Sequence, residues 1–331
     1  MRMLVTGGAG FIGSNFVHYT RQHHPEYEIT VIDSLTYAGS DDSLRAVASD
    51  ISFVTQDIRD AGTVNKVVAD ADVVVHFAAE SHVDNSLSDP GIFVETNLVG
   101  TFNLLEAVRR HDCRFHHIST DEVFGDLPVD SVEKFTEETR YNPSSPYSAT
   151  KAGSDMLVRA WARSYGVAAT ISNCANNYGP YQHVEKLIPR QVTNLLTGRR
   201  VKLYGAGENV REWTHVDDHN AAVHAILRGG DAGETYLIGS GDERSNLDIV
   251  QTVLRIMGFD ENDFDHVSDR PGHDLRYSND SSKIRERLGW RPIHTDIRHG
   301  LEATIDWYRE NRWWWQSKKE STEQKYAIVG R

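Results

Sequence analysis

A short acidic segment and a tyrosine–lysine pair are the residues of this sequence best suited to acid–base chemistry. The segment Ser119–Glu122 places Thr120 before two adjacent carboxylates, and Tyr147 stands four residues before Lys151. Oxidising a secondary alcohol needs one base and one hydride acceptor. An adjacent acid and base suggest a second task, the removal of a proton and a hydroxyl from neighbouring carbons. The pattern therefore indicates a dehydratase that uses transient redox chemistry.

Tyr147 and Lys151 would share one face of a helix, because side chains four residues apart are neighbours there. A free tyrosine has a pKa of roughly 10 and is a poor base at neutral pH. A nearby ammonium and a positively charged nicotinamide both favour the phenolate, so we expect them to lower this pKa. Tyr147 could then take a hydroxyl proton while the carbon's hydride leaves for NAD. Thr120 could hydrogen-bond the same hydroxyl.

Asp121 and Glu122 follow the fifth expected strand, at the end where open parallel sheets bind their ligands. An Asp–Glu pair can also be simple helix-end charge or part of a solvated turn. Its position after Thr120, with a tyrosine–lysine pair downstream, favours the acid–base role.

The first half of the chain alternates short apolar runs with longer amphipathic ones, which predicts an α/β fold with a Rossmann-type doubly wound parallel sheet. Helices are expected near 11–21, 62–69, 93–110 and 145–165, and strands are expected at 3–5, 29–32, 51–54, 73–77, 114–118 and 168–172.

Beyond residue 175 the alternation loosens, and Gly- and Asp-rich loops separate helices expected near 187–196, 219–227, 247–257 and 281–288. We therefore predict a Rossmann domain with the catalytic residues over 1–175. A smaller mixed α/β cap that mainly binds substrate follows over 176–315, and part of its chain could return to the first domain. Residues 316–331 are predicted to be a polar, disordered tail.

A glycine-rich turn, Gly7-Gly8-Ala9-Gly10, lies between the first strand and the first helix, and Gly13 follows it. Glycine lets the backbone approach a pyrophosphate, whose charge then meets the helix N-terminus. Asp33 ends the second strand, where a carboxylate accepts both ribose hydroxyls and repels a 2′-phosphate. The pattern predicts NAD rather than NADP. Asp57 and Ile58 would flank the adenine.

Charge and composition argue against several classes of partner and site. The formal net charge of −13 argues against nucleic acid or an anionic membrane as a partner, and no apolar run approaches the ~18 residues of a membrane span. The first residues lack the apolar core of a secretory signal, so a cytoplasmic enzyme is expected. Cys113 and Cys174 are too few for a disulfide framework. The adjacent pairs His23-His24 and His116-His117 would diverge, so no bound metal is expected.

These residues resemble the extended short-chain dehydrogenase/reductase superfamily and, within it, the dTDP-glucose 4,6-dehydratase family. The resemblance runs through TGGAGFIGS, DSLTYAG, QDIRD, HFAAESHVD, STDEVFG, SPYSATKAGSD, NNYGPYQHVEKLIP, LYGAGENVREWTHVDDH, DRPGHDLRY and LGWRP, and only the tail lies outside it. The glycine motif and Y-x-x-x-K identify the superfamily, whereas STDEV, VEKLIP and DRPGHDLRY together are specific to the family.

The resemblance implies a complete mechanism and a nucleotide-sugar substrate. Tyr147 would deprotonate the glucose 4-hydroxyl, with Thr120 hydrogen-bonding it, as the C4 hydride moves to NAD. Glu122 would remove the C5 proton, and Asp121 would protonate the departing C6 hydroxyl. The hydride would then return to C6 while C5 is reprotonated, giving dTDP-4-keto-6-deoxy-glucose. The family also implies a homodimer formed by the helices near 93–110 and 145–165.

Two sets of binding residues complete the expected site, beside the catalytic Thr120, Asp121, Glu122, Tyr147 and Lys151. The cofactor set is Gly7, Gly10, Phe11, Ile12, Gly13, Asp33, Ser34, Leu35, Thr36, Asp57, Ile58, Ala78, Ala79, Ser81, Thr96, Ser119, Tyr147, Lys151 and Asn177. The substrate set is Ser81, Thr120, Asn176, Glu185, Lys186, Leu187, Lys202, Tyr204, Arg211, Asn246, Arg270, His273 and Tyr277, with Arg211 and Arg270 as the diphosphate partners.

The chain departs from the family pattern at four positions. Asn85 and Asn173 each stand where the family usually has an arginine, so each removes a guanidinium. Phe124 replaces a usual tyrosine and Val184 a usual proline, and both changes are milder.

Two other functions remain open at this point. A nucleotide-sugar 4-epimerase or 4-dehydrogenase would use Tyr147 and Lys151 but would leave the carboxylate pair without a task. An NAD-sensing scaffold would not need an intact Thr120, Tyr147 and Lys151. The base of the nucleotide also stays open, because thymine and uracil differ by one methyl, worth roughly 1–3 kcal/mol.

Overall fold

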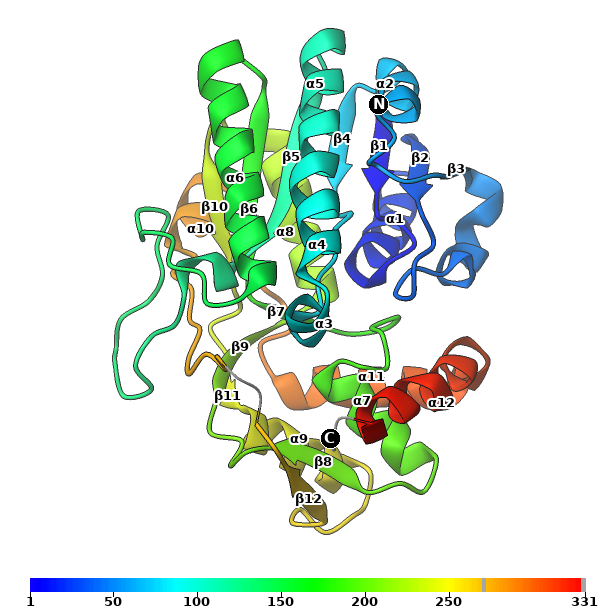
Figure 1. Cartoon of the computed structure of the whole chain (residues 1–331), viewed down its shortest axis with the longest axis vertical. Helices are drawn as coiled ribbons and strands as arrows, with labels where there is room; N and C mark the ends of the chain where they lie inside the picture. Colours follow the sequence, from blue (N-terminus) through cyan, green and yellow to red (C-terminus); the bar gives the residue numbers. More distant parts are fainter. Residues whose placement is uncertain (270–271, 329–331) are drawn as a thin grey trace.

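A seven-stranded parallel sheet forms the upper part of the molecule in Figure 1, a computed structural model that describes residues 1–269 and 272–328. Its strand order is β10-β6-β5-β4-β1-β2-β3, and all neighbouring strands run parallel. The strands are β1 (Arg2–Thr6), β2 (Glu28–Asp33), β3 (Ile51–Thr55), β4 (Val73–His76), β5 (Arg114–Thr120), β6 (Ala169–Cys174) and β10 (Thr235–Ile238).

Helices cover both faces of this sheet because its strands are apolar on both sides. In β1, Met3 and Val5 pack with α1 (Phe11–His23), α8 (Val216–Gly229) and α10 (Ser282–Leu288). Leu4, between them, faces the opposite way and packs with α2 (Ala61–Ala69), α5 (Thr101–His111) and α6 (Pro146–Tyr165). The predicted α/β doubly wound fold is confirmed.

The connection from β4 to β5 is more broken than the single helix expected over 93–110. It contains α3 (Val83–Ser88), α4 (Pro90–Phe93) and a π-helical segment, η2 (Val94–Gly100), before α5 begins. Gly100 sits against Ile58, where a Cβ would lie 2.4 Å from that side chain. Two short 3-10 helices, η1 (Asp41–Asp50) and η3 (Asp121–Phe124), follow β2 and β5.

A smaller α/β part lies below the carboxyl ends of the sheet (Figure 1). It has a three-stranded sheet of β7 (Asn176–Tyr178), β9 (Val210–His215) and β11 (Glu243–Ser245), and a parallel pair of β8 (Val201–Tyr204) and β12 (Phe264–Val267). Helices α7 (Leu187–Leu196), α9 (Asn246–Ile256) and α11 (Ile297–Glu310) pack around them. Their core includes Ile188, Val192, Trp213 and Leu301.

Residues 316–328 of the segment expected to be a disordered tail are helical instead, and 329–331 lie outside the described residues. Helix α12 (Arg312–Ile328) lies beside α7 in Figure 1. Trp314 and Trp315 at its start are buried in the core of the smaller part, and Lys319 and Tyr326 are buried further along. The expectation of disorder was wrong because the polar residues of this segment find buried partners from distant parts of the chain. Across the described residues, no helix is long and apolar enough to cross a membrane.

Candidate active site

A cavity of about 310 Å³ opens at the carboxyl ends of the parallel strands. It extends from the turn after β1, past the ends of β2 and β4, to the end of β5 and the start of α6. In a sheet of this order, the connections on the two sides of β1 lead in opposite directions, which leaves a crevice for ligands at this edge.

The glycine turn after β1 forms one wall of the cavity and leaves no space for side chains. Gly7 has a φ of +67°, and a Cβ there would lie 2.5 Å from the backbone nitrogen of Ala78. A Cβ on Gly13 would lie 2.3 Å from the carbonyl oxygen of Gly7. The turn therefore keeps its backbone open to a ligand beside the N-terminus of α1, which suits a pyrophosphate.

Asp33 ends β2 in the same cavity wall. Its two carboxylate oxygens accept hydrogen bonds from the backbone nitrogens of Ala9 (2.9 Å) and Leu35 (2.8 Å). Burial raises the pKa of Asp33, and these two hydrogen bonds oppose the rise. The carboxylate is thus fixed in place beside the glycine turn, where it could accept ribose hydroxyls.

The expected cofactor residues meet in this cavity. All of them line it except Leu35, which instead holds Asp33 through its backbone. Asn176 and Asn177 add two buried side-chain oxygens that have no hydrogen-bond partner among the described residues. Open glycine backbone, a positioned carboxylate and unsatisfied amide oxygens together fit a dinucleotide.

Thr120 and the two carboxylates that follow it lie at the end of β5. Thr120 is the N-cap of η3, and its hydroxyl accepts a hydrogen bond from the backbone nitrogen of Glu122 (3.3 Å). This short helix turns Asp121 and Glu122 into the cavity wall opposite the glycine turn. The local sequence positions both carboxylates because a threonine is a good helix cap.

Asp121 is in surroundings that favour its neutral form. It is 1% exposed, and burial, followed by the charges of Glu122 and Glu212, raises its pKa well above the usual range. Arg211 and a hydrogen bond from Asn279 Nδ2 (3.2 Å) oppose this effect. A carboxyl group kept protonated in this way can serve as a general acid.

Tyr147 enters the cavity from the first turn of α6, one residue after Pro146. A capping box between Ser145 and Ser148 fixes that turn. Burial raises the pKa of Tyr147 well above its usual value, and Glu122 raises it further, whereas a hydrogen bond with the Thr120 hydroxyl lowers it. The pKa of Tyr147 is therefore raised, whereas the sequence led us to expect that it would be lowered.

Burial of the phenol explains this difference, because it outweighs the stabilisation expected from Lys151, whose ammonium makes its hydrogen bonds elsewhere. Its Nζ donates to the carbonyl oxygen of Ile118 (2.8 Å) and lies 3.4 Å from Nε2 of His117. Burial lowers the pKa of Lys151 to about 8, against the charge of Asp155. Asp155 contacts His117 at 3.2 Å, so Lys151, which lines the cavity, also belongs to a buried network with His117 and Asp155.

A second cavity of about 170 Å³ adjoins the first and shares Ser81, Glu122, Asn176, Glu185 and Lys186 with it. Within the described part of the chain, every expected substrate residue lines this second cavity except Thr120, which lines the first. Arg270 lies outside the described residues.

Several cationic and aromatic side chains of the second cavity are fixed by partners. Arg211 donates to the carbonyl oxygens of Val210 (2.8 Å) and Asp274 (2.9 Å). Its guanidinium lies over the ring of Tyr277, 4.2 Å from the ring centre. Lys202 pairs with Asp265 at 2.7 Å. These contacts hold positive charge in the cavity wall.

Sequence reasoning missed residues that act from distant parts of the chain. Asn279 holds Asp121, and His117 with Asp155 holds Lys151. Arg190 and Tyr326 line the second cavity. No local sequence pattern marks these residues. Asp121, Asp155 and His117, which stand close to the catalytic positions in the sequence, could nevertheless have suggested a network.

Asn173 and Asn85, which stand where the family usually has arginine, each form hydrogen bonds to nearby groups. Asn173 donates to the carbonyl oxygen of Thr120 (3.0 Å) and to Asp155 (3.1 Å), so an amide now fills this buried position. Asn85 hydrogen-bonds Tyr37. Phe124 and Val184 are both buried.

Outside the two cavities, His215, Asp217 and His294 offer potential ligand atoms within 4.8 Å of one another. The imidazole of His215 caps α8 by accepting from the backbone nitrogen of Asp217 (3.2 Å), and it stacks on His294. Both histidines of the cluster are therefore in contact with a neighbouring backbone group or ring.

Comparison with known proteins places this geometry in a family. The sequence model of the GDP-mannose 4,6 dehydratase family matches residues 4–304. A dTDP-glucose 4,6-dehydratase from Mycobacterium tuberculosis is 64% identical over 330 residues, which cover 100% of each chain. The chain belongs to the dTDP-glucose 4,6-dehydratase family.

Solved structures agree with this family assignment. The dTDP-glucose 4,6-dehydratase DesIV from Streptomyces venezuelae, crystallised with NAD bound, is 48% identical and has a TM-score of 0.92. The match covers 96% of this chain and 100% of DesIV. A UDP-glucose 4-epimerase from Thermotoga maritima is more distant, at 29% identity and a TM-score of 0.87 over 94% of this chain and 99% of its own.

Proposed function

We propose that this protein is a nucleotide-sugar 4,6-dehydratase that uses NAD to convert dTDP-glucose into dTDP-4-keto-6-deoxy-glucose and water. The observation that carries the proposal is the pair Asp121 and Glu122, which faces the same cavity as Tyr147 and Lys151. Membership of the dTDP-glucose 4,6-dehydratase family supports the assignment.

When bound, NAD would supply an acceptor for the C4 hydride of the sugar and a donor for its return to C6. Gly7, Gly10 and Gly13 would admit its pyrophosphate, and Asp33 would bind its adenosine ribose. The carboxylate at this position favours NAD over NADP, because a 2′-phosphate would be repelled.

The chain's own side chains then handle the protons. Tyr147 takes the proton of the 4-hydroxyl, and Thr120, which hydrogen-bonds Tyr147, also orients that hydroxyl. The resulting ketone acidifies the C5 proton, which Glu122 removes. Asp121, whose pKa is raised by its burial, gives its proton to the C6 hydroxyl, which departs as water. C5 is reprotonated when the hydride returns to C6.

The second cavity would hold the nucleotide half of the substrate. It shares Glu122 with the first cavity, so a sugar beside Glu122 would extend its diphosphate towards Arg211. In this arrangement residues 1–175 bind the cofactor and carry the chemistry, and 176–315 mainly bind the substrate. We further propose that the enzyme works as a cytoplasmic homodimer.

Isotope transfer tests the proposed reaction directly. Substrate deuterated at C4 should give product deuterated at C6 without added reduced cofactor, because the hydride stays within one active site. Tyr147→Phe is the control and should form no product. Loss of the label to solvent or to free cofactor, or a product epimerised at C4 with its 6-hydroxyl retained, would refute the dehydratase assignment. Parallel reactions with the uridine analogue would define the preference for the base.

A further inference from the structure

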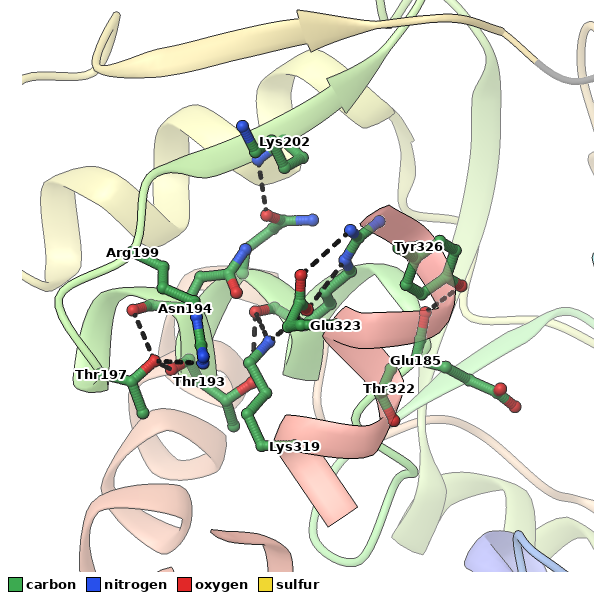
Figure 2. Close-up of polar contacts among 12 residues, drawn as sticks. Glu185, Thr193, Asn194, Thr197, Arg199, Lys202, Lys319, Thr322, Glu323 and Tyr326 are labelled. Carbon is green, nitrogen blue, oxygen red and sulfur yellow. Dashed lines mark hydrogen bonds and ion pairs between the residues drawn. The ribbon is translucent and has the colours of Figure 1, made fainter. Parts of the chain in front are cut away.

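Helix α12 lies outside the matched family region, which ends at residue 304, and yet it reaches the second cavity. Its start is fixed by Trp314 and Trp315, which are 3% and 0% exposed. Figure 2 shows Lys319, Glu323 and Tyr326 along the side of α12 that faces the rest of the smaller part. The spacing of four and three residues places these side chains on one helical face.

This face of α12 is held by a buried ionic cluster. Arg190 on α7 is 3% exposed and donates two hydrogen bonds to the carboxylate of Glu323, at 3.2 and 3.3 Å. Lys319 Nζ donates to the same carboxylate at 2.7 Å and to the carbonyl oxygen of Arg190 at 3.3 Å. Two parallel hydrogen bonds from a guanidinium fix geometry as well as charge, so α12 is held firmly against α7.

Tyr326 is the residue of α12 that lines the cavity, and it is held from two directions. The Arg190 guanidinium lies over its ring, 3.7 Å from the ring centre. Its hydroxyl donates to the carbonyl oxygen of Glu185 at 3.3 Å, a contact also drawn in Figure 2. With one face covered and its hydroxyl bonded, the ring is a rigid surface before any ligand arrives.

The neighbours of Tyr326 indicate that it would lie near the nucleotide of a bound substrate rather than near the sugar. Arg211 and Tyr277 line the same cavity and interact electrostatically with the catalytic carboxylates. Tyr326 interacts instead with Tyr204 and Asp84, which line the second cavity and not the first. A nucleotide sugar with its sugar at Glu122 and its diphosphate near Arg211 would bring its nucleoside to this other end.

We infer that Tyr326 binds the nucleoside of the substrate, with Arg190 and Glu323 as positioning residues that hold its ring in place. A flat base packing on a fixed aromatic ring gains affinity without the cost of ordering that ring. The inference rests on the proposed function, because the substrate class sets which group reaches this end. It gives the C-terminal helix a direct part in substrate recognition.

The test uses the full-length enzyme loaded with NAD. Tyr326→Ala should weaken the binding of thymidine diphosphate, measured by calorimetry, by about tenfold or more, as removal of an aromatic stacking partner does. KM for dTDP-glucose should rise by a similar factor and kcat should stay close to that of the unaltered enzyme, because the sugar end is untouched. Tyr326→Phe should restore most of the affinity.

Gln324→Ala, on the exposed side of the same helix, is the matched control and should change neither constant. If Tyr326→Ala does not fold, Tyr326→Leu replaces it, since leucine keeps apolar volume without an aromatic face. Unchanged affinity for thymidine diphosphate would overturn the inference. A fall in kcat as large as the rise in KM would also overturn it, because that result means that the whole wall has moved. An unaltered enzyme that forms no keto-deoxy product would instead refute the proposed function.

Discussion

At the scale of single residues, two adjacent carboxylates are given different tasks by their surroundings. Asp121 is almost fully buried and interacts with Glu122 and Glu212, which favours its protonated form. Glu122 is only partly buried and lines both cavities. One residue is suited to giving a proton and its neighbour to taking one. Adjacent positions in the chain would thus serve adjacent carbons of the sugar.

Glu122→Gln should separate the two halves of the reaction. The change keeps the size of the side chain but removes the base, so Tyr147 and Lys151 can still oxidise C4 while the C5 proton stays. Loss of a general base typically costs about a hundred- to ten-thousandfold. Rapid mixing with dTDP-glucose should give a burst of reduced-nicotinamide absorbance with little keto-deoxy product.

Tyr147→Phe is the control for this burst and should abolish it, since the first step then fails. Turnover of the Glu122 variant at close to the normal rate would contradict the assigned role. So would identical absorbance changes in the two variants.

We predict that the rate of hydride transfer falls at alkaline pH, because Lys151 loses its charge there. Burial lowers its pKa to about 8, so the ammonium is present below that pH and is lost as the pH rises through it. Without this charge the phenolate of Tyr147 is less favoured, and the rate of C4 oxidation should fall. Single-turnover absorbance measured across neutral and alkaline pH would show the decline.

Lys151→Arg separates this charge effect from other titrations. A guanidinium stays protonated over the same range. The rate of C4 oxidation in this variant should therefore show no decline near pH 8, even if its absolute value is lower. A decline of the same shape in both proteins would assign the titration to another group.

The catalytic residues could be predicted from sequence because each stands next to a recognisable motif. Thr120, Asp121 and Glu122 are consecutive, and Tyr147 and Lys151 have helical spacing. The residues that tune them could not be predicted, because Asn279 reaches Asp121 from 158 positions away. Such contacts depend on the completed fold.

At the scale of elements, the turn between β1 and α1 shows how closely backbone segments can approach. Gly7 is close enough to the chain after β4 that any side chain would collide with backbone rather than with a flexible group. The turn therefore fixes both the helix start and the distance between two neighbouring strands.

Gly7→Ala should cost more stability than the same change at Gly166, and it should also weaken NAD binding. Both glycines have a positive φ, +67° and +71°, so both variants carry the backbone strain of about 1–2 kcal/mol. At Gly166 nothing lies within 4 Å of the added Cβ, whereas at Gly7 backbone atoms lie 2.5 to 2.9 Å away. Thermal unfolding with and without NAD would measure the difference; equal melting temperatures would contradict it.

Elements with strong local signals were predicted well, and elements built on distant partners were not. Ser145 and Pro146 mark the start of α6, and the β-branched Thr170 and Ile171 mark the strand after it. The pairing of β8 with β12 joins segments about sixty residues apart and has no local signature. Helix α12 was misjudged because the charges of Lys319 and Glu323 indicate exposure, whereas Arg190 draws them into a buried cluster.

At the scale of the whole molecule, apolar side chains remain exposed along η2, α5 and α6. Val94, Val99, Phe102, Met156 and Tyr165 are 43% to 54% exposed, and Figure 1 shows α5 and α6 side by side on one face of the sheet. Large apolar side chains left exposed on neighbouring helices are typical of a protein interface.

Replacing Val99 and Met156 together by glutamate should convert the expected dimer into a monomer, because four buried charges would face one another across the two-fold interface. Light scattering coupled to size-exclusion chromatography would measure the mass. Val132→Glu is the control, since Val132 is 93% exposed on a distant loop. A monomeric mass for the unaltered protein would refute the homodimer.

Strand β10, the last strand of the large sheet to be synthesised, affects how the newly made chain folds. β6 is complete at Cys174, but its outer neighbour β10 begins only at Thr235. During synthesis the edge of β6 therefore stays uncovered while the ribosome makes about sixty more residues, and the unpaired backbone groups of an uncovered strand edge invite pairing with another chain. A fragment that ends at residue 175 would carry this exposed edge permanently. The newly made chain should therefore be most prone to aggregation, and most dependent on chaperones, before β10 emerges.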